Sequence, residues 1–299
     1  MKVQHTLPPR LLWLLVGLTL GWGINWPIMK IILSEMEPMR FRTLCLVFGA
    51  LGLFVLARAS GLRLDVPRGQ WPRVIAVGLV YMAGWNICAV YGVRLMASGR
   101  AAILGYTMPA WGVILSAWLL GERLTPRRVL GVGLAMGGVV LLLWNELQAV
   151  GQSPIGALLM LGAALSWAFS TVMIKRWPVD LPASSFAAWQ MVIGVIPILG
   201  TALAFETGPF NPFSLSVGPM LAIFYNISVA FIFCYWAWMK IALFAPISVS
   251  SLAVMMTPVV GVFSGMLLLH ERPQWQDFAA LCLVVASLCT VMIPRRNSA

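Results

Sequence analysis

Several apolar segments of the chain carry an aromatic residue next to an amide or hydroxyl group. Trp85 is followed by Asn86, and Trp22 lies three residues before Asn25. Rigid aromatic walls with a few amide groups suit a small molecule that has an apolar body and a polar end. This pattern predicts a site that binds such a molecule. The candidate substrate-binding residues are Trp22, Asn25, Tyr81, Trp85, Asn86, Tyr106, Met108, Trp167, Trp189, Tyr225, Asn226 and Met256.

The same residue types also have a simpler interpretation. A tryptophan or methionine in the middle of an apolar helix commonly packs against a neighbouring helix, and an amide there commonly bonds across the helix interface. Pro109 and Pro258 could likewise be plain kinks. Because a proline frees carbonyls that must face protein or a cavity, and because the two prolines occupy matching positions, we expect them to act in gating.

Other kinds of chemistry lack the residues they need. The nine acidic residues and the two histidines all fall in predicted loops or at predicted helix ends, whereas a proton relay inside a membrane would use one of them within a span. No phosphate-binding loop motif is present. The five cysteines form no Cys-x-x-Cys pair and have no neighbouring histidine, so no metal site is indicated. We expect no catalytic residue, no cofactor and no enzymatic activity, and passive or facilitated transport rather than pumping.

The composition requires a membrane. Hydrophobic residues make up 61% of the chain and charged residues 10%, against about 45–50% and about 25% in soluble domains. A span needs about 20 apolar residues. The sequence predicts an all-α membrane protein with ten transmembrane helices, at residues 11–33, 39–58, 71–93, 97–120, 127–145, 154–174, 184–205, 217–240, 246–269 and 275–293.

The basic residues define an orientation. The net charge is +11, and most lysines and arginines fall in loops on one side of the predicted bundle, together with both termini. Cytoplasmic loops carry an excess of such residues. We therefore expect both termini in the cytoplasm and the lipid bilayer as a partner. This bias explains the positive charge without nucleic acid as a partner.

A spaced motif occurs in both halves of the chain. Pro109 precedes Glu122 by thirteen residues, Pro258 precedes Glu271 by the same interval, and the two copies lie 149 residues apart. The repeat predicts two five-helix units, residues 1–149 and 150–299. Because five is odd, the second unit enters the membrane inverted, and inverted repeats commonly hold a substrate site between them.

These motifs resemble the drug/metabolite transporter superfamily in its ten-helix EamA-type branch. The resemblance rests on Gly21-Trp22-Gly23-x-Asn25-x-Pro27-x-x-Lys30, on Pro109-x-x-Gly112 with Leu119-Leu120-Gly121-Glu122-Arg123, and on Pro258-x-x-Gly261 with Leu268-Leu269-His270-Glu271-Arg272. It implies a central cavity lined mainly by the first, third, fourth, sixth, eighth and ninth helices. Small multidrug relatives carry a glutamate in the first helix, where this chain offers the neutral Asn25.

Within that branch the chain is most similar to bacterial inner-membrane exporters of aromatic amino acids. The similarity implies Trp85, Asn86, Met108, Trp167 and Trp189 as cavity residues. We expect an inner-membrane exporter or facilitator of aromatic and other large apolar amino acids, working as a monomer by alternating access. Two alternatives stay open, namely export of hydrophobic drugs or other metabolites on the same fold, and a non-transporting membrane scaffold.

Overall fold

The computed structural model describes residues 9–148, 154–244 and 247–292, and within these ranges it contains helices and no strand. The helices follow one another with short connections. Their bounds are α1 Pro9–Ile32, α2 Pro38–Ala59, α3 Trp71–Gly78, α4 Trp85–Leu95, α5 Ser98–Gly105, α6 Met108–Leu120, α7 Pro126–Gln148, α8 Ile155–Arg176, α9 Ala183–Phe205, α10 Val217–Tyr225, α11 Cys234–Phe244, α12 Ile247–Leu269 and α13 Trp275–Met292. Two wide-turn π-helical segments, η2 Leu79–Gly84 and η4 Asn226–Phe233, join α3 to α4 and α10 to α11.

Every predicted span coincides with a helical segment. Eight helical stretches of the described chain are long and apolar enough to cross a membrane, and two shorter apolar ones, Val254–Leu269 and Trp275–Val291, follow them. The predicted span ends at residues 246 and 293, and the boundary between residues 149 and 150, lie outside the described residues. The outer surface is apolar, with Trp118 and Leu267 each 77% exposed. An apolar surface of this kind needs lipid around it, and the protein is a multi-pass membrane protein.

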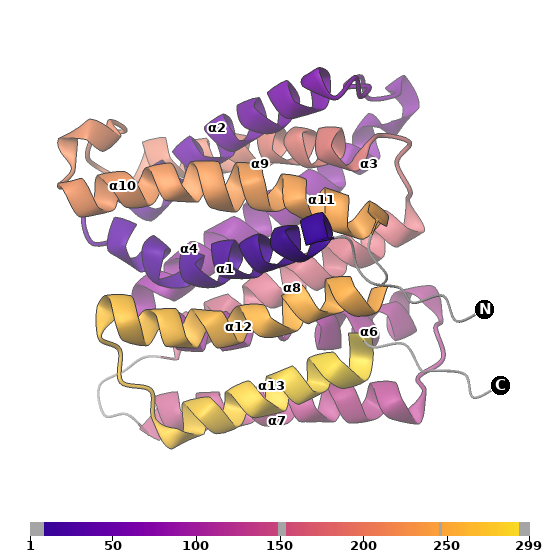
Figure 1. Ribbon diagram of the computed structural model, residues 1–299, viewed down its shortest axis with the longest axis vertical. Helices are drawn as coiled ribbons and strands as arrows, with labels where there is room; N and C mark the ends of the chain where they lie inside the picture. Colours follow the sequence, from indigo (N-terminus) through magenta and orange to yellow (C-terminus); the bar gives the residue numbers. More distant parts are fainter. Residues whose placement is uncertain (1–8, 149–153, 245–246, 293–299) are drawn as a thin grey trace.

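The helices pack in pairs that relate the two halves of the chain. In Figure 1, α2 crosses α9 at one edge of the bundle and α13 runs alongside α7 at the other, and both pairs are in contact. Towards the centre α1 packs against α12, while α6 packs against α8. Exchanging the first five spans with the last five maps the α1–α12 contact onto the α6–α8 contact. The same exchange maps the α2–α9 contact and the α7–α13 contact onto themselves. The start of α1 and the end of α13 lie at the same end of the bundle (Figure 1).

Local backbone geometry also matches across the 149-residue offset. Gly121 follows α6 with a left-handed φ of 67°, and His270 follows α12 with a φ of 52°. The next amides bond back six residues, Glu122 N–H to the carbonyl of Ser116 and Glu271 N–H to that of Gly265. The segments η2 and η4 overlap under the same offset. These matches are consistent with a duplicated unit.

The matching spans differ at their prolines. In the fourth span, α5 ends at Gly105 and α6 begins at Met108, so the helix is interrupted just before Pro109. In the ninth span, α12 continues through Pro258 without a break. A proline removes one backbone bond and makes either arrangement accessible. The structure therefore shows the two related helices in different forms.

Candidate functional site

Two adjoining cavities lie in the centre of the bundle. The wide cavity, of about 590 Å³, reaches from one end of the bundle to the middle, and the inner cavity, of about 110 Å³, continues beyond it. They share lining residues on α1, α6, α8, α11 and α12. The predicted residues that line the inner cavity are Trp22, Asn25, Trp85, Asn86, Tyr106, Met108 and Trp167.

Aromatic rings form the wall where the two cavities meet. Trp167 on α8 stands edge-on between Tyr81 and Trp85, with ring centroids at 4.7 and 5.0 Å. The Tyr81 hydroxyl lies 3.1 Å from the hydroxyl of Tyr235. Tyr235 in turn packs edge-on against Trp22 at 5.9 Å. Rings from two spans of each half thus create one apolar surface for a flat or bulky ligand.

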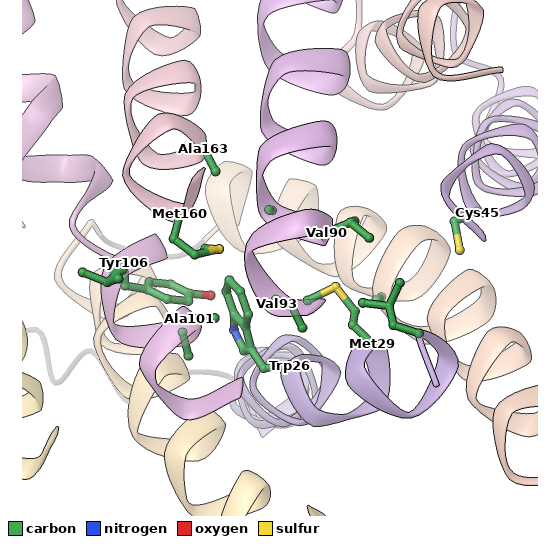
Figure 2. Close-up of a cluster of buried hydrophobic side chains, with 14 of the residues drawn as sticks. Trp26, Met29, Cys45, Val90, Val93, Ala101, Tyr106, Met160 and Ala163 are labelled. Carbon is green, nitrogen blue, oxygen red and sulfur yellow. The ribbon is translucent and has the colours of Figure 1, made fainter. Parts of the chain in front are cut away.

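The far side of the inner cavity is closed by packed side chains. Trp26 is 5% exposed and packs edge-on against Tyr106, with ring centroids 6.4 Å apart. Figure 2 shows the Trp26 ring between Tyr106 and Met29 in this buried cluster. A Cβ atom added to Gly105 or Gly261 would lie within 3.2 Å of the Trp26 ring, so these helices approach each other through the tryptophan. This cluster is the floor of the inner cavity.

Amide groups supply the polar part of the cavities. Asn226 donates to the side-chain oxygen of Asn25 at 2.5 Å, which links η4 to α1. Asn86 donates to the carbonyl of Met82 in its own span at 2.7 Å. The side-chain nitrogen of Gln190, in the wall of the wide cavity, is buried without a hydrogen-bond partner. Gln190 therefore offers a free donor to a ligand, because a buried amide gains by finding a partner.

An arginine that is not among the predicted site residues also lines the inner cavity. Arg42 on α2 is 3% exposed, and its Nη1 atom lies 3.4 Å from the side-chain oxygen of Asn226. It shares a helix face with Leu46, Gly49 and Leu53, which are all buried. The signal that could have revealed Arg42 is this spacing of four, seven and eleven residues along a helix.

Charged groups surround the wide end of the cavity. Glu122 and Lys175 both line the wide cavity and form an ion pair, and Arg128 donates to Glu122 at 3.0 Å. These hydrogen bonds, that from Lys175 above all, lower the pKa of Glu122 below its ordinary value. Since Lys175 is 60% exposed, the wide cavity reaches the surface here. We call this the open end.

The opposite end is tied together by carboxylates that bond backbone amides. Glu206 accepts from Met39 N–H at 2.8 Å and from Arg40 N–H at 2.9 Å, at the start of α2. Glu271 accepts from Ser98 N–H at 2.7 Å and Gly99 N–H at 3.1 Å, at the start of α5. Free amides and the dipole at a helix start favour a negative group. We call this the closed end.

A further ion pair and a lysine add to the closed end. Arg100 pairs with Asp277 at 2.7 Å, and both side chains are largely buried. Lys30 donates to the carbonyl of Met96 at 2.5 Å. The contacts join α5 to α13 and α1 to the short turn before α5. A separate cavity of about 550 Å³ lies outside them, lined by Lys30, Arg100 and Glu271 among others.

The structure does not bring every predicted residue to the cavities. Trp189 packs against Trp71 and Phe54, and its indole donates to the carbonyl of Leu64 at 2.8 Å. Met256 is 47% exposed on the outer surface. Tyr225 donates to the carbonyl of Gly21 at 3.0 Å and acts as a link between helices.

The remaining predicted residues lie near the cavities. Asn226 contacts the cavity residues Asn25 and Arg42. Tyr81 and Pro109 line the wide cavity, while Pro258 is buried within α12. Among the described side chains, no group of three or more His, Cys, Asp or Glu could hold a metal ion. What the arrangement offers is binding of a small molecule between two halves of a membrane protein.

A bundle of membrane-spanning helices with a cavity open at one end and closed at the other defines a membrane transporter. The model of the EamA-like transporter family matches residues 10–144 and 154–293, and the chain belongs to this family.

Curated relatives agree with this class. An uncharacterized transporter, YoaV, of Bacillus subtilis is 28% identical over 259 residues, covering 86% of this chain and 88% of that one. A probable amino-acid metabolite efflux pump of Escherichia coli is 26% identical over 279 residues, covering 89% of each chain. A solved crystal structure with 20% identity superposes with a TM-score of 0.67 over 95% of this chain and 96% of that one, which supports the fold.

Proposed function

We propose that this transporter exports aromatic and other large apolar amino acids across the bacterial inner membrane, with both termini in the cytoplasm. The observation that carries the proposal is the edge-on arrangement of Tyr81, Trp85 and Trp167 beside the inner cavity. Such rings favour an aromatic or bulky aliphatic side chain. The name of the Escherichia coli relative, a probable amino-acid metabolite efflux pump, supports the same class of substrate.

We further propose that transport proceeds by alternating access between two inverted units, residues 1–149 and 150–299. With the termini in the cytoplasm, the open end faces the cytoplasm, and the substrate enters there. Glu122 and Glu271 then occupy related positions on opposite faces of the membrane. The outward-open state arises when the two units exchange their arrangements. In that state α12 breaks near Pro258, and the fourth span closes near Pro109.

Uptake into proteoliposomes tests this function. Purified full-length protein is assayed with labelled phenylalanine, tryptophan, methionine and leucine, with and without a pH gradient. We expect saturable uptake that does not depend on the gradient. Uptake of none of the four would overturn the proposal, and accumulation driven by the gradient would overturn facilitated transport.

A pair of tryptophan variants locates the site. Trp167→Ala removes the ring that stands between Tyr81 and Trp85, and we expect KM for phenylalanine to rise about tenfold through lost ring contacts. Trp118→Ala is the matched control, because that ring is 77% exposed on the outer surface of α6. Equal KM values for Trp167→Ala and Trp118→Ala would remove Trp167 from the site.

A further inference from the structure

Arg42 is a buried cation for which the described part of the chain provides no carboxylate partner. The ion pairs of the described residues involve other arginines and lysines, and the Nε atom of Arg42 has no hydrogen-bond partner. The closest acceptor of Nη2 is the sulfur of Met29, at 2.5 Å, which is a weak acceptor. An unpaired charge inside a protein is strongly unfavourable. The site is therefore short of one negative charge.

The surroundings of Arg42 keep the guanidinium in place. The rings of Phe41 and Phe231 lie 4.7 and 5.5 Å from its central carbon, and Asn226 accepts from Nη1. Arginine needs little further ordering to bind when its plane is already fixed by neighbouring rings. The edge that carries Nε and Nη2 lacks a strong acceptor. That edge is a fork of two parallel N–H groups, which matches a carboxylate.

We propose that Arg42 binds the carboxylate of the transported substrate in the inner cavity. This inference rests on the proposed function, since it concerns the same cavity and the same class of substrate. The carboxylate accepts from Nε and Nη2 of Arg42, and it takes the place of the Met29 sulfur. The apolar side chain extends towards Trp85 and Trp167, where the inner cavity meets the wide cavity.

The charge of the inner cavity sets its selectivity. Its lining contains Arg42 and no acidic side chain, while Glu122 lies at the open end of the wide cavity, where Lys175 and Arg128 neutralise it. A carboxylate therefore gains a charged partner in the inner cavity, whereas an ammonium group meets a like charge. Aromatic carboxylates without an amine should bind, and aromatic amines without a carboxylate should not.

Three ligands with the same ring test this inference. Phenylalanine, 3-phenylpropionate and phenethylamine are titrated by calorimetry against the full chain in detergent. We expect the two carboxylates to bind and phenethylamine to bind at least tenfold more weakly. Phenethylamine binding as tightly as 3-phenylpropionate, or no binding of either carboxylate, would overturn the proposal.

Substitutions on α2 assign the effect to one residue. Arg42→Gln should weaken 3-phenylpropionate binding about 10- to 100-fold, as expected for loss of a charge-assisted pair. Arg42→Lys keeps the charge but loses the fork of two N–H groups. Its affinity for 3-phenylpropionate should lie between that of the native chain and that of Arg42→Gln. Arg58→Gln, an exposed arginine of the same helix, is the control and should bind normally. Size-exclusion profiles establish whether each variant folds. If Arg42→Gln does not fold, Arg42→Lys and the three-ligand series still test whether Arg42 binds the carboxylate.

The failure of this inference is distinct from the failure of the proposed function. If Arg42→Gln transports phenylalanine with unchanged KM, the carboxylate site is overturned and amino-acid transport stands. If no amino acid is transported but 3-phenylpropionate binds in an Arg42-dependent way, the proposed substrate is wrong and the carboxylate site stands.

Discussion

Glu122 and Glu271 follow the ends of two related helices, α6 and α12, in the same backbone geometry, yet they bind different partners. Glu122 pairs with Lys175 and Arg128, whereas Glu271 accepts from the amides at the start of α5. The offset of 149 residues does not relate these partners to one another. It maps Ser98 onto Ile247, the first residue of α12, and it maps Lys30 onto Val179, four residues beyond Lys175. The two glutamates therefore differ in the kind of partner they bind, side-chain cations for Glu122 and backbone amides at a helix start for Glu271.

Removing Glu271 should weaken the closed end. Glu271→Ala loses two hydrogen bonds to a charged acceptor, each about 1.5–3 kcal/mol, so the outward-open population should rise about tenfold or more. The substitution Val262→Cys reports this opening, because Val262 is 1% exposed and lines the cavity outside the closed end. In a background with Cys282→Ser, Glu271→Ala should accelerate the labelling of this cysteine by an impermeant maleimide. Unchanged labelling would show that Glu271 does not hold this end closed.

Pro258 should be needed for the change to the outward-open state and not for substrate binding. Pro258→Ala restores a backbone bond inside α12, where a proline costs about 3 kcal/mol, and so it favours the continuous helix seen here. We expect transport to fall at least tenfold while the affinity for 3-phenylpropionate stays the same. Calorimetry and proteoliposome uptake on one preparation separate the two effects. A variant that transports at the normal rate would remove Pro258 from the gate.

The ion pair between Glu122 and Lys175 at the open end should make the stability of the folded protein fall at acid pH. The pKa of Glu122 is lowered, chiefly by the hydrogen bond from Lys175, so this pairing stabilises the folded state above the ordinary pKa of 4.5 and is lost as the pH falls through the lowered value. Thermal unfolding midpoints between pH 7 and pH 3 measure the effect. Glu122→Gln should flatten the acid limb and leave the midpoint near pH 7 below that of the native chain. An identical acid limb in both proteins would contradict this.

Trp189 should contribute to stability rather than to substrate affinity. Trp189→Phe keeps an aromatic ring beside Trp71 and Phe54 but loses the bond to Leu64, a cost of about 1 kcal/mol. Trp189→Ala removes the ring as well and should cost about 3 kcal/mol. Unfolding midpoints should fall in that order, with KM for phenylalanine unchanged. A raised KM in the well-folded Trp189→Phe protein would return this residue to the site.

Hydropathy and the repeated Pro-to-Glu-Arg spacing were sufficient to predict the helices and their approximate ends. Side-chain direction was harder, because it depends on which partners surround a helix. Met255 is 3% exposed and its neighbour Met256 is 47% exposed, yet α12 carries apolar residues on every face and gives no pattern that separates them. Trp189 lies beside Gln190 in the chain and faces a different group of helices.

Charged residues near helix ends were also ambiguous in the sequence. Arg40 and Arg42 lie two residues apart at the start of α2, and both could extend towards water. Arg40 is half-buried over the Phe210 ring and donates to the carbonyl of Glu206, whereas Arg42 is fully buried. The bond between Asn226 and Arg42 spans 184 residues of sequence, and a single chain gives no signal for such a pair.

The wide turns of η2 carry a consequence for how this transporter can vary. A π-helical turn contains an additional residue compared with an α-helical turn, and one residue corresponds to a rotation of about 100°. The wide turn absorbs this residue locally, so deleting one residue between Leu79 and Gly84 would return the segment to α-helical turns and keep the rotation of α4. Trp85 and Asn86 would stay in the inner cavity, and Tyr91 would keep its bond to Glu206 at the closed end. A deletion within α4 itself has no wide turn to absorb it, and it would rotate the residues on one side of it relative to those on the other. The segment η2 is thus the place in this span where the chain can lose a residue without moving both the substrate wall and the seal.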